Sequence, residues 1–197
     1  LFCYLHLAAD PELAVALAAR GVVAIAFETV RDAAGGLPLL APMSAIAGRL
    51  APQVGAQGLQ RSNGGAGVLV PGLPGVPPAH LVVLGAGVVG MNAARVAVGL
   101  GARVTLLDRY AEPLARAETA LGARVETRLA SAEAIACVLK EADVVIGAAQ
   151  VCAVVLGEGT DAEAAARLAF YAEVVGLNSS KDGAGPLDLG PGGPEAR

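Results

Sequence analysis

The feature that most constrains the fold is a glycine pattern within residues 81–108. Gly85, Gly87 and Gly90 form GxGxxG, directly after the apolar run "LVVL" and at the start of the helix-compatible run "VVGMNAARVAVG". Asp108 ends a second apolar run, roughly 20 residues further on, which is the spacing expected of a dinucleotide-binding unit. A GxGxxG alone would be weak support for nucleotide binding, but this strand–turn–helix–strand context completes the fingerprint.

Each glycine of this pattern has a physical role. Gly85 permits the tight turn from strand to helix, Gly87 lets a pyrophosphate approach the backbone, and Gly90 lets the helix pack closely on the strand. The phosphates would bind free N–H groups in the first helical turn, which includes Val88, at the positive end of the helix dipole. The alternative is a glycine-rich α/β turn that binds no nucleotide.

The acidic residue favours one cofactor. A carboxylate at Asp108 can accept hydrogen bonds from both ribose hydroxyls and would repel a 2′-phosphate, so we expect NAD rather than NADP. The neighbouring Arg109 is the one residue that argues for NADP, because its charge could tolerate that phosphate.

From His80 onward the sequence alternates between strand and helix patterns. Four strands are predicted, separated by three helices with short connections, which indicates a doubly wound parallel sheet of the α/β class. His80 itself is expected in the preceding loop. A complete dinucleotide fold has about six strands, so the domain is expected to be incomplete, with an unpaired sheet edge. The predicted strands are "LVVLG", "ARVTLLD", "ARVETR" and "DVVIGAA".

The residues before this unit give a less regular pattern. Asp10 is expected to cap a short helix that ends at Gly21, and residues 22–30 read as a buried strand. A loop follows. Ser44 is expected to cap a second helix that runs to about Leu59 and bends at Pro52, and the Gly/Pro-rich residues up to 80 predict a loop with at most one short hairpin.

Composition excludes several classes of function. The chain has 14 basic and 18 acidic residues and 3% aromatics, so no basic or stacking surface for nucleic acid is expected. Its longest apolar run, after Asp143, is interrupted by Gln150 and is shorter than the roughly 20 residues of a membrane span. The three cysteines lack metal-site spacing and predict reduced, partly buried thiols in a cytoplasmic protein. These thiols are Cys3, Cys137 and Cys152.

Several segments together resemble bacterial L-alanine dehydrogenases over about residues 1–150. They include "YLHLAAD", "LPLLAPMSAIAGRLAPQVGA" and the glycine-rich unit itself. The resemblance implies a homo-oligomer, usually a hexamer, that uses NAD to convert L-alanine reversibly to pyruvate and ammonium. It also implies a remnant of an α/β substrate domain at 1–38, an NAD-binding domain at 39–150, and a divergent tail at 151–197 that is first helical and then disordered.

The resemblance also implies roles for individual residues. His6 would contact the substrate and act as the acid/base group. Met43 would lie near the substrate, Ser44 would contact the cofactor phosphates, and Ala149 and Gln150 would flank the adenine and nicotinamide. From the residues alone, His6 reads more readily as a hydrogen-bonded core histidine, Met43 as a core gap-filler and Ser44 as a helix cap.

The chain also departs from the family pattern. The family's substrate-binding arginine and lysine precede the "YLHLA" segment, and its catalytic aspartate lies well after "VIGA", where residues 151–197 show no match. Pro113 and Ala130 stand where members often carry a lysine and a serine. We therefore expect a truncated or frameshifted chain that binds NAD weakly and turns over little alanine. The alternatives are a non-catalytic NAD-binding module, the NAD-binding part of a proton-translocating transhydrogenase, and a chain that does not fold stably.

Overall fold

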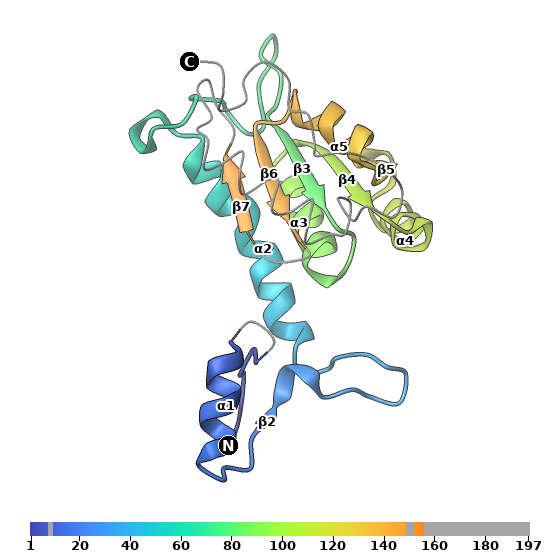
Figure 1. Cartoon of the computed structure of the whole chain (residues 1–197). Coiled ribbons are helices and arrows are strands. Elements are labelled where there is room, and N and C mark those ends of the chain that lie inside the picture. The colour runs from blue at the N-terminus through green and yellow to red at the C-terminus, as the bar shows by residue number, and fades with distance from the viewer. Residues whose placement is uncertain (8–9, 149–151, 156–197) are drawn as a thin grey trace. The chain divides into compact units, whose positions relative to one another are not determined.

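The structure is a computed structural model that describes residues 1–7, 10–148 and 152–155. The chain divides into two compact units, Leu1–Ala45 and Ile46–Arg197 (Figure 1). The expected tail, helical and then disordered, falls almost wholly outside the described residues.

The second unit is built on a five-stranded sheet with the order β5-β4-β3-β6-β7. Four strands run parallel: β3 (His80–Leu84), β4 (Arg103–Asp108), β5 (Glu126–Leu129) and β6 (Val144–Gly147). These are the four predicted strands, so the α/β parallel-sheet prediction is confirmed. The fifth strand was not predicted. β7 (Cys152–Val155) lies antiparallel to β6 and covers the sheet edge that was expected to be unpaired.

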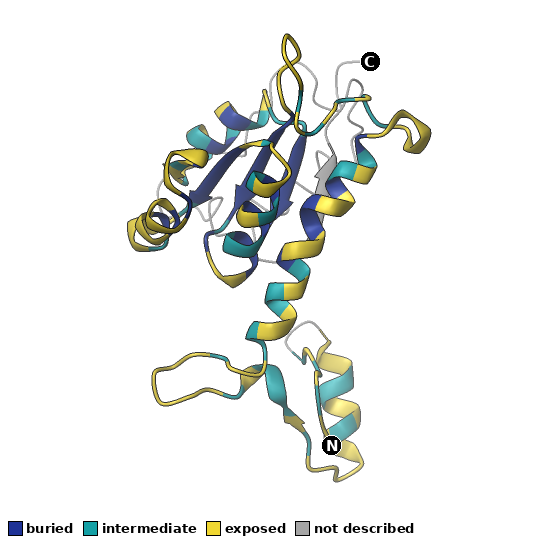
Figure 2. Cartoon of the chain, turned by 180° about the vertical axis from the view of Figure 1, so that it is seen from behind, coloured by how far each residue is buried: buried dark blue, intermediate teal, exposed yellow. Residues whose placement is uncertain are grey.

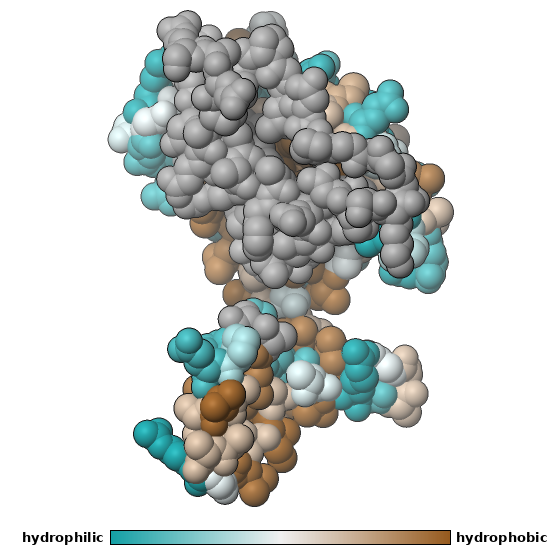
Figure 3. All heavy atoms as spheres, in the orientation of Figure 1, coloured by the Kyte–Doolittle hydropathy of each residue, from teal (hydrophilic) through white to brown (hydrophobic). Residues whose placement is uncertain are grey.

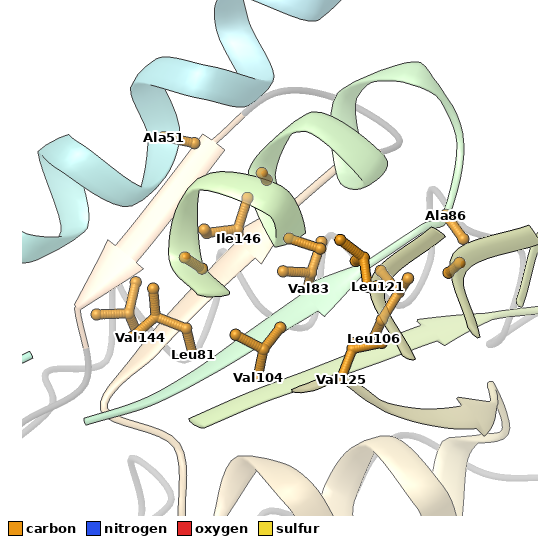
Figure 4. Packing of buried hydrophobic residues seen from close by; sticks show 14 of the residues in the cluster. Ala51, Leu81, Val83, Ala86, Val104, Leu106, Leu121, Val125, Val144 and Ile146 are labelled. Atoms are coloured by element: carbon orange, nitrogen blue, oxygen red, sulfur yellow. The ribbon is translucent and has the colours of Figure 1, made fainter. Parts of the chain in front are cut away.

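Helices pack on both faces of this sheet (Figure 1). The second-unit part of α2 (Ala41–Gly58), α3 (Val88–Gly99) and α4 (Ala111–Leu121) share one apolar cluster with Leu81 and Val83. α5 (Ala132–Leu139) packs on the opposite face against Val82 and Leu84. Because successive strand residues point to opposite faces, β3 contributes to both clusters. It is buried throughout (Figure 2), and Figure 4 shows its Leu81 and Val83 in the first cluster.

Within the second unit, α2 packs against its neighbours at backbone distance because of two glycines. A Cβ atom at Gly48 would lie 2.2 Å from the carbonyl oxygen of Val89, and one at Gly55 would lie 2.7 Å from a methyl carbon of Val144. Small residues at these positions let the helix lie directly on α3 and β6. This close packing was not predicted.

The start of α2 corrects the prediction for Ser44. The helix begins at Ala41, and the Ser44 N–H donates to the carbonyl of Leu40, so Ser44 lies inside the first turn and is not the N-cap. Pro42 suits this earlier start, because proline is tolerated in the first turn of a helix. The helix ends at Gly58, next to the predicted Leu59, and carries Pro52 in its interior.

The first unit has little regular structure. α1 (Pro11–Ala19) begins as predicted, with the Leu13 N–H donating to the Asp10 carboxylate at 2.9 Å. The predicted buried strand at 22–30 is wrong in extent and in burial. Only β2 (Ile25–Ala26) forms, parallel to β1 (Phe2–Cys3), and a 3-10 turn follows over Phe27–Thr29. None of the described residues before Ile46 is buried (Figure 2).

The segment between α2 and β3 is mainly irregular, as expected. It contains a 3-10 turn at Arg61–Asn63 and one antiparallel bridge between Leu73 and Val76, which agrees with a single short hairpin. His80 corrects the prediction of a loop residue: it is the first residue of β3 and only 4% exposed. No helix within the described ranges is long and apolar enough to cross a membrane.

Candidate dinucleotide site

The turn between β3 and α3 has the geometry that the glycine pattern predicts. Gly85 adopts φ +107°, a conformation that side chains disfavour, and its N–H donates to the Leu107 carbonyl at 2.7 Å. A Cβ atom at Gly90 would lie 1.7 Å from the Gly85 carbonyl oxygen. Only glycine at position 90 therefore lets the first turn of α3 lie this close to the end of β3.

The middle glycine faces open space. Gly87 is the N-cap of α3, and a Cβ atom there would meet nothing within 4 Å. Val88, the first helical residue, is 47% exposed. The first N–H groups of a helix have no intrahelical acceptor and carry partial positive charge. The backbone at Gly87 therefore has space for an anion such as a pyrophosphate to approach.

Asp108 is the last residue of β4, the strand next to β3. Its carboxylate therefore lies at the carboxyl ends of the strands, as does the glycine turn. Its Oδ2 accepts a hydrogen bond from the Ala86 N–H at 2.7 Å, and its Oδ1 accepts one from the Tyr110 N–H at 3.0 Å. Ligands of open α/β sheets bind at the carboxyl ends of the strands. The second unit thus brings five predicted site residues together at the carboxyl ends of β3 and β4: Gly85, Gly87, Val88, Gly90 and Asp108.

His6 lies in the first unit and is exposed, so the alternative of a buried core histidine is wrong. Its backbone is in the left-handed region, with φ +49°. The Glu28 carboxylate accepts the His6 N–H at 2.7 Å and the Leu5 N–H at 3.3 Å. The His6 ring stacks on Tyr4 with centroids 5.6 Å apart.

A surface hollow of about 470 Å³ lies beside this turn. Its lining includes His6, Glu28 and Thr29 but neither Met43 nor Ser44. Met43 is 40% exposed, so it does not fill a core gap, and Ser44 is half-buried on α2. Apolar side chains cover much of the visible face of the first unit (Figure 3).

Glu28 was not among the predicted site residues. Burial raises its pKa, but the hydrogen bonds from its own backbone and from the backbones of His6 and Leu5 outweigh this, so the pKa lies below its ordinary value. The signal in the sequence was a single carboxylate inside the apolar run "VVAIAFETV". An isolated charge in such a run needs a partner, and here the partner is the backbone next to His6.

Comparison with known families agrees with these two units. Residues 51–156 match the family described as "Alanine dehydrogenase/PNT, C-terminal domain", and residues 1–47 match "Alanine dehydrogenase/PNT, N-terminal domain". The chain belongs to the alanine dehydrogenase/PNT family. The resemblance inferred from the sequence is therefore confirmed.

Individual members of the family are similar in sequence and in fold. The alanine dehydrogenase of Mycolicibacterium smegmatis is 55% identical over 148 residues, which are 75% of this chain and 40% of that protein. A solved L-alanine dehydrogenase has a TM-score of 0.68 at 52% identity and covers 75% of this chain and 41% of its own. The chain thus spans about two fifths of the length of these relatives.

A solved transhydrogenase from Sinorhizobium meliloti has a TM-score of 0.59 at 24% identity, with 76% of this chain and 43% of its own covered. This likeness shows a shared fold only.

Two predicted cofactor residues of this chain, Ala149 and Gln150, lie outside the described residues.

The cysteine prediction needs one correction, since Cys137 is exposed rather than partly buried. Cys3 is half-buried, and both are free thiols. Among residues 1–7, 10–148 and 152–155, no group of three or more His, Cys, Asp or Glu side chains is arranged to hold a metal ion.

Proposed function

We propose that this chain carries the NAD-binding unit and part of the substrate site of an NAD-dependent L-alanine dehydrogenase. The observation that carries the proposal is the tight Gly85–Gly90 turn beside the Asp108 carboxylate, in a chain 55% identical to an alanine dehydrogenase. The reaction converts L-alanine, NAD⁺ and water to pyruvate, ammonium, NADH and a proton.

The residues of the second unit fit a dinucleotide. The first turn of α3, from Gly87, would hold the pyrophosphate, and the free lone pairs of Asp108 would accept the ribose hydroxyls. When bound, NAD supplies the hydride acceptor. The preference for NAD over NADP follows from the charge of Asp108.

The first unit would supply proton transfer. Oxidation of an amino acid requires loss of a proton together with the hydride, and an imidazole exchanges protons near neutral pH. A ring nitrogen of His6 would accept that proton. The Glu28 carboxylate holds the His6 backbone and the hollow beside it provides space for a small substrate. Met43 and Ser44 are proposed to contact substrate and cofactor phosphates respectively.

Two measurements on the full chain test the proposal. Isothermal titration with NAD and with NADP should show binding of NAD, weaker than in full-length relatives, and a preference over NADP. NADH formation from L-alanine at alkaline pH should be slow, and His6→Gln should abolish it. Absence of NAD binding by folded protein would overturn the proposal. Rapid turnover would contradict the expected weak activity.

A non-catalytic NAD-binding module is the second candidate. It is favoured by the contrast between the second unit, which has the glycine turn and a buried core, and the first unit, where no described residue is buried. NAD binding without any alanine turnover, unchanged by His6→Gln, would select this candidate.

Self-association is proposed as well, with a hexamer as in the intact family. Support comes from an exposed apolar stripe on α2, formed by Ile46, Leu50 and Val54 at helical spacing. Light scattering should give a mass above 19.4 kDa, and Leu50→Glu should reduce it. A monomer at all concentrations would contradict self-association. A cytoplasmic location remains a prediction.

A further inference from the structure

The Asp108 carboxylate has a second task in addition to the proposed contact with ribose. We propose that Asp108 is a positioning residue that latches the glycine turn through the Ala86 N–H, and so fixes the turn before any nucleotide binds. The benefit for cofactor binding rests on the proposed function, but the latch itself does not.

The latch joins a buried donor to a fixed acceptor. Ala86 is only 2% exposed and belongs to the buried cluster of Figure 4, so its N–H needs a partner within the protein. Asp108 Oδ2 supplies that partner at 2.7 Å. The Asp108 backbone is held in turn, since its carbonyl accepts the Ala130 N–H at 2.8 Å.

Two contacts therefore fix the turn on either side of Gly87. On one side the Asp108 carboxylate holds Ala86, and on the other the backbone of Gly90 lies against the carbonyl of Gly85. Gly87 is left with open space on its side-chain face. A phosphate site that is fixed in advance loses less conformational freedom on binding, which raises affinity.

The latch requires a carboxylate. Ala86 and Tyr110 donate to different oxygens of Asp108, so both oxygens must be acceptors. An asparagine has one carbonyl oxygen and one NH₂ group, and the NH₂ would face a backbone donor. Asp108→Asn therefore breaks one of the two hydrogen bonds in any orientation. The carboxylate keeps further lone pairs that remain free for ribose hydroxyls.

The first experiment needs no nucleotide. In amide NMR of the full chain, the hydrogen-exchange rate at Ala86 reports whether its N–H is held by an acceptor within the protein. In Asp108→Ala, which removes both acceptor oxygens, exchange of the Ala86 amide should be roughly tenfold faster than in wild type. Asp10→Asn is the control at a carboxylate of the first unit, because asparagine also caps helices, and it should leave the Ala86 exchange rate unchanged. An Ala86 exchange rate that is the same in Asp108→Ala and in wild type would overturn the latch.

The second experiment separates the latch from a ribose-only role. ADP and 2′,3′-dideoxy-ADP are titrated into wild type and Asp108→Ala, which has neither acceptor oxygen. The latch predicts that the variant weakens both ligands by a similar factor, since the fixed turn binds phosphate in both. If Asp108 only contacted the ribose, dideoxy-ADP would bind both proteins equally, and the proposal would fail. If neither ligand bound wild type, the proposed function would fail while the amide measurement still decided the latch.

Discussion

At the scale of single residues, the glycine pattern contains positions with different physical demands. Gly90 has no room for a methyl group, whereas Gly87 has open space on its side-chain face and an ordinary φ of −74°. The sequence predicts a different role for each glycine, and the geometry is compatible with that division: Gly90 lies in a tight contact, and Gly87 leaves space for a ligand.

The first prediction uses this difference. Gly90→Ala places a methyl group against the Gly85 carbonyl and should destabilise the protein by about 1–3 kcal/mol, the usual cost of overpacking. Gly87→Ala should leave stability within about 0.5 kcal/mol and weaken NAD binding, because the methyl group occupies the side from which phosphate approaches. Denaturant unfolding and NAD titration measure the two effects. A Gly87→Ala variant that unfolds like Gly90→Ala would contradict this division.

At the scale of elements, His80 connects neighbouring strands at the amino end of the sheet. Its Nε2 lies 2.8 Å from Thr105 Oγ1, and its Nδ1 lies 2.8 Å from the Arg103 guanidinium and 3.1 Å from the Glu141 carbonyl oxygen. The Thr105 hydroxyl donates onward to Glu126 on β5. The Asp143 carboxylate accepts the His80 N–H at 2.7 Å. The Arg103 contact requires a neutral ring, because a guanidinium can only donate and Nδ1 must then accept.

The second prediction follows from the lowered pKa of His80. Burial lowers it first, by penalising the charged ring, and the Arg103 charge lowers it further, against opposing contributions from Glu141 and Asp143. The contribution of His80 to the free energy of unfolding should therefore be fully present above about pH 6.5, the pKa of histidine in the unfolded chain. It should be lost as the pH falls from there through the lowered pKa of the folded state.

This pH dependence can be assigned because the chain has only two histidines. Urea unfolding between pH 5 and pH 8 should show this loss of unfolding free energy at low pH in wild type. The same loss is expected in His6→Gln, because the His6 ring is exposed and takes no part in the His80 network. The loss should be absent in His80→Gln. Equal pH dependence in wild type and His80→Gln would assign the effect to other groups.

The third prediction concerns α2. Gly48→Ala and Gly55→Ala should each destabilise the protein by about 1–3 kcal/mol, because the helix must move away from α3 or β6 to admit the new methyl group. Gly99→Ala is the matched control on α3, where a Cβ atom meets nothing within 4 Å, and it should be neutral or stabilising by up to about 1 kcal/mol. Thermal unfolding compares the three. Neutral Gly48 and Gly55 variants would show that α2 does not pack this closely.

At the scale of the whole molecule, buried residues are unevenly distributed between the units. The core of the second unit comprises two clusters on opposite faces of one sheet, whereas none of the described residues before Ile46 is buried. Stability should therefore reside in the second unit.

The fourth prediction is a difference in proteolysis. Limited digestion should cut within residues 1–45 at least about tenfold faster than within 80–147, since local opening costs less where no residue is buried. Mass spectrometry of early fragments identifies the cuts. Early cleavage inside β3 or α3 would contradict this picture. Absence of a cooperative melt would support the alternative that the chain does not fold stably.

The sequence by itself determined the parallel sheet, because alternating apolar runs and helix patterns with short connections leave few other arrangements, and it located the glycine turn and Asp108 by fixed spacing. It also placed the cap at Asp10, since capping depends on local hydrogen bonds.

Only the tertiary structure decided which apolar residues are buried. Residues 22–30 look like a buried strand, yet Val23 is 78% exposed, while His80 is buried although polar. Burial depends on which segments meet in space, and local pattern does not record that. For the same reason three contacts emerged only from the fold: Gly48 with Val89, Glu28 with His6, and Asp108 with Ala86. Each joins groups at least 22 residues apart in the chain.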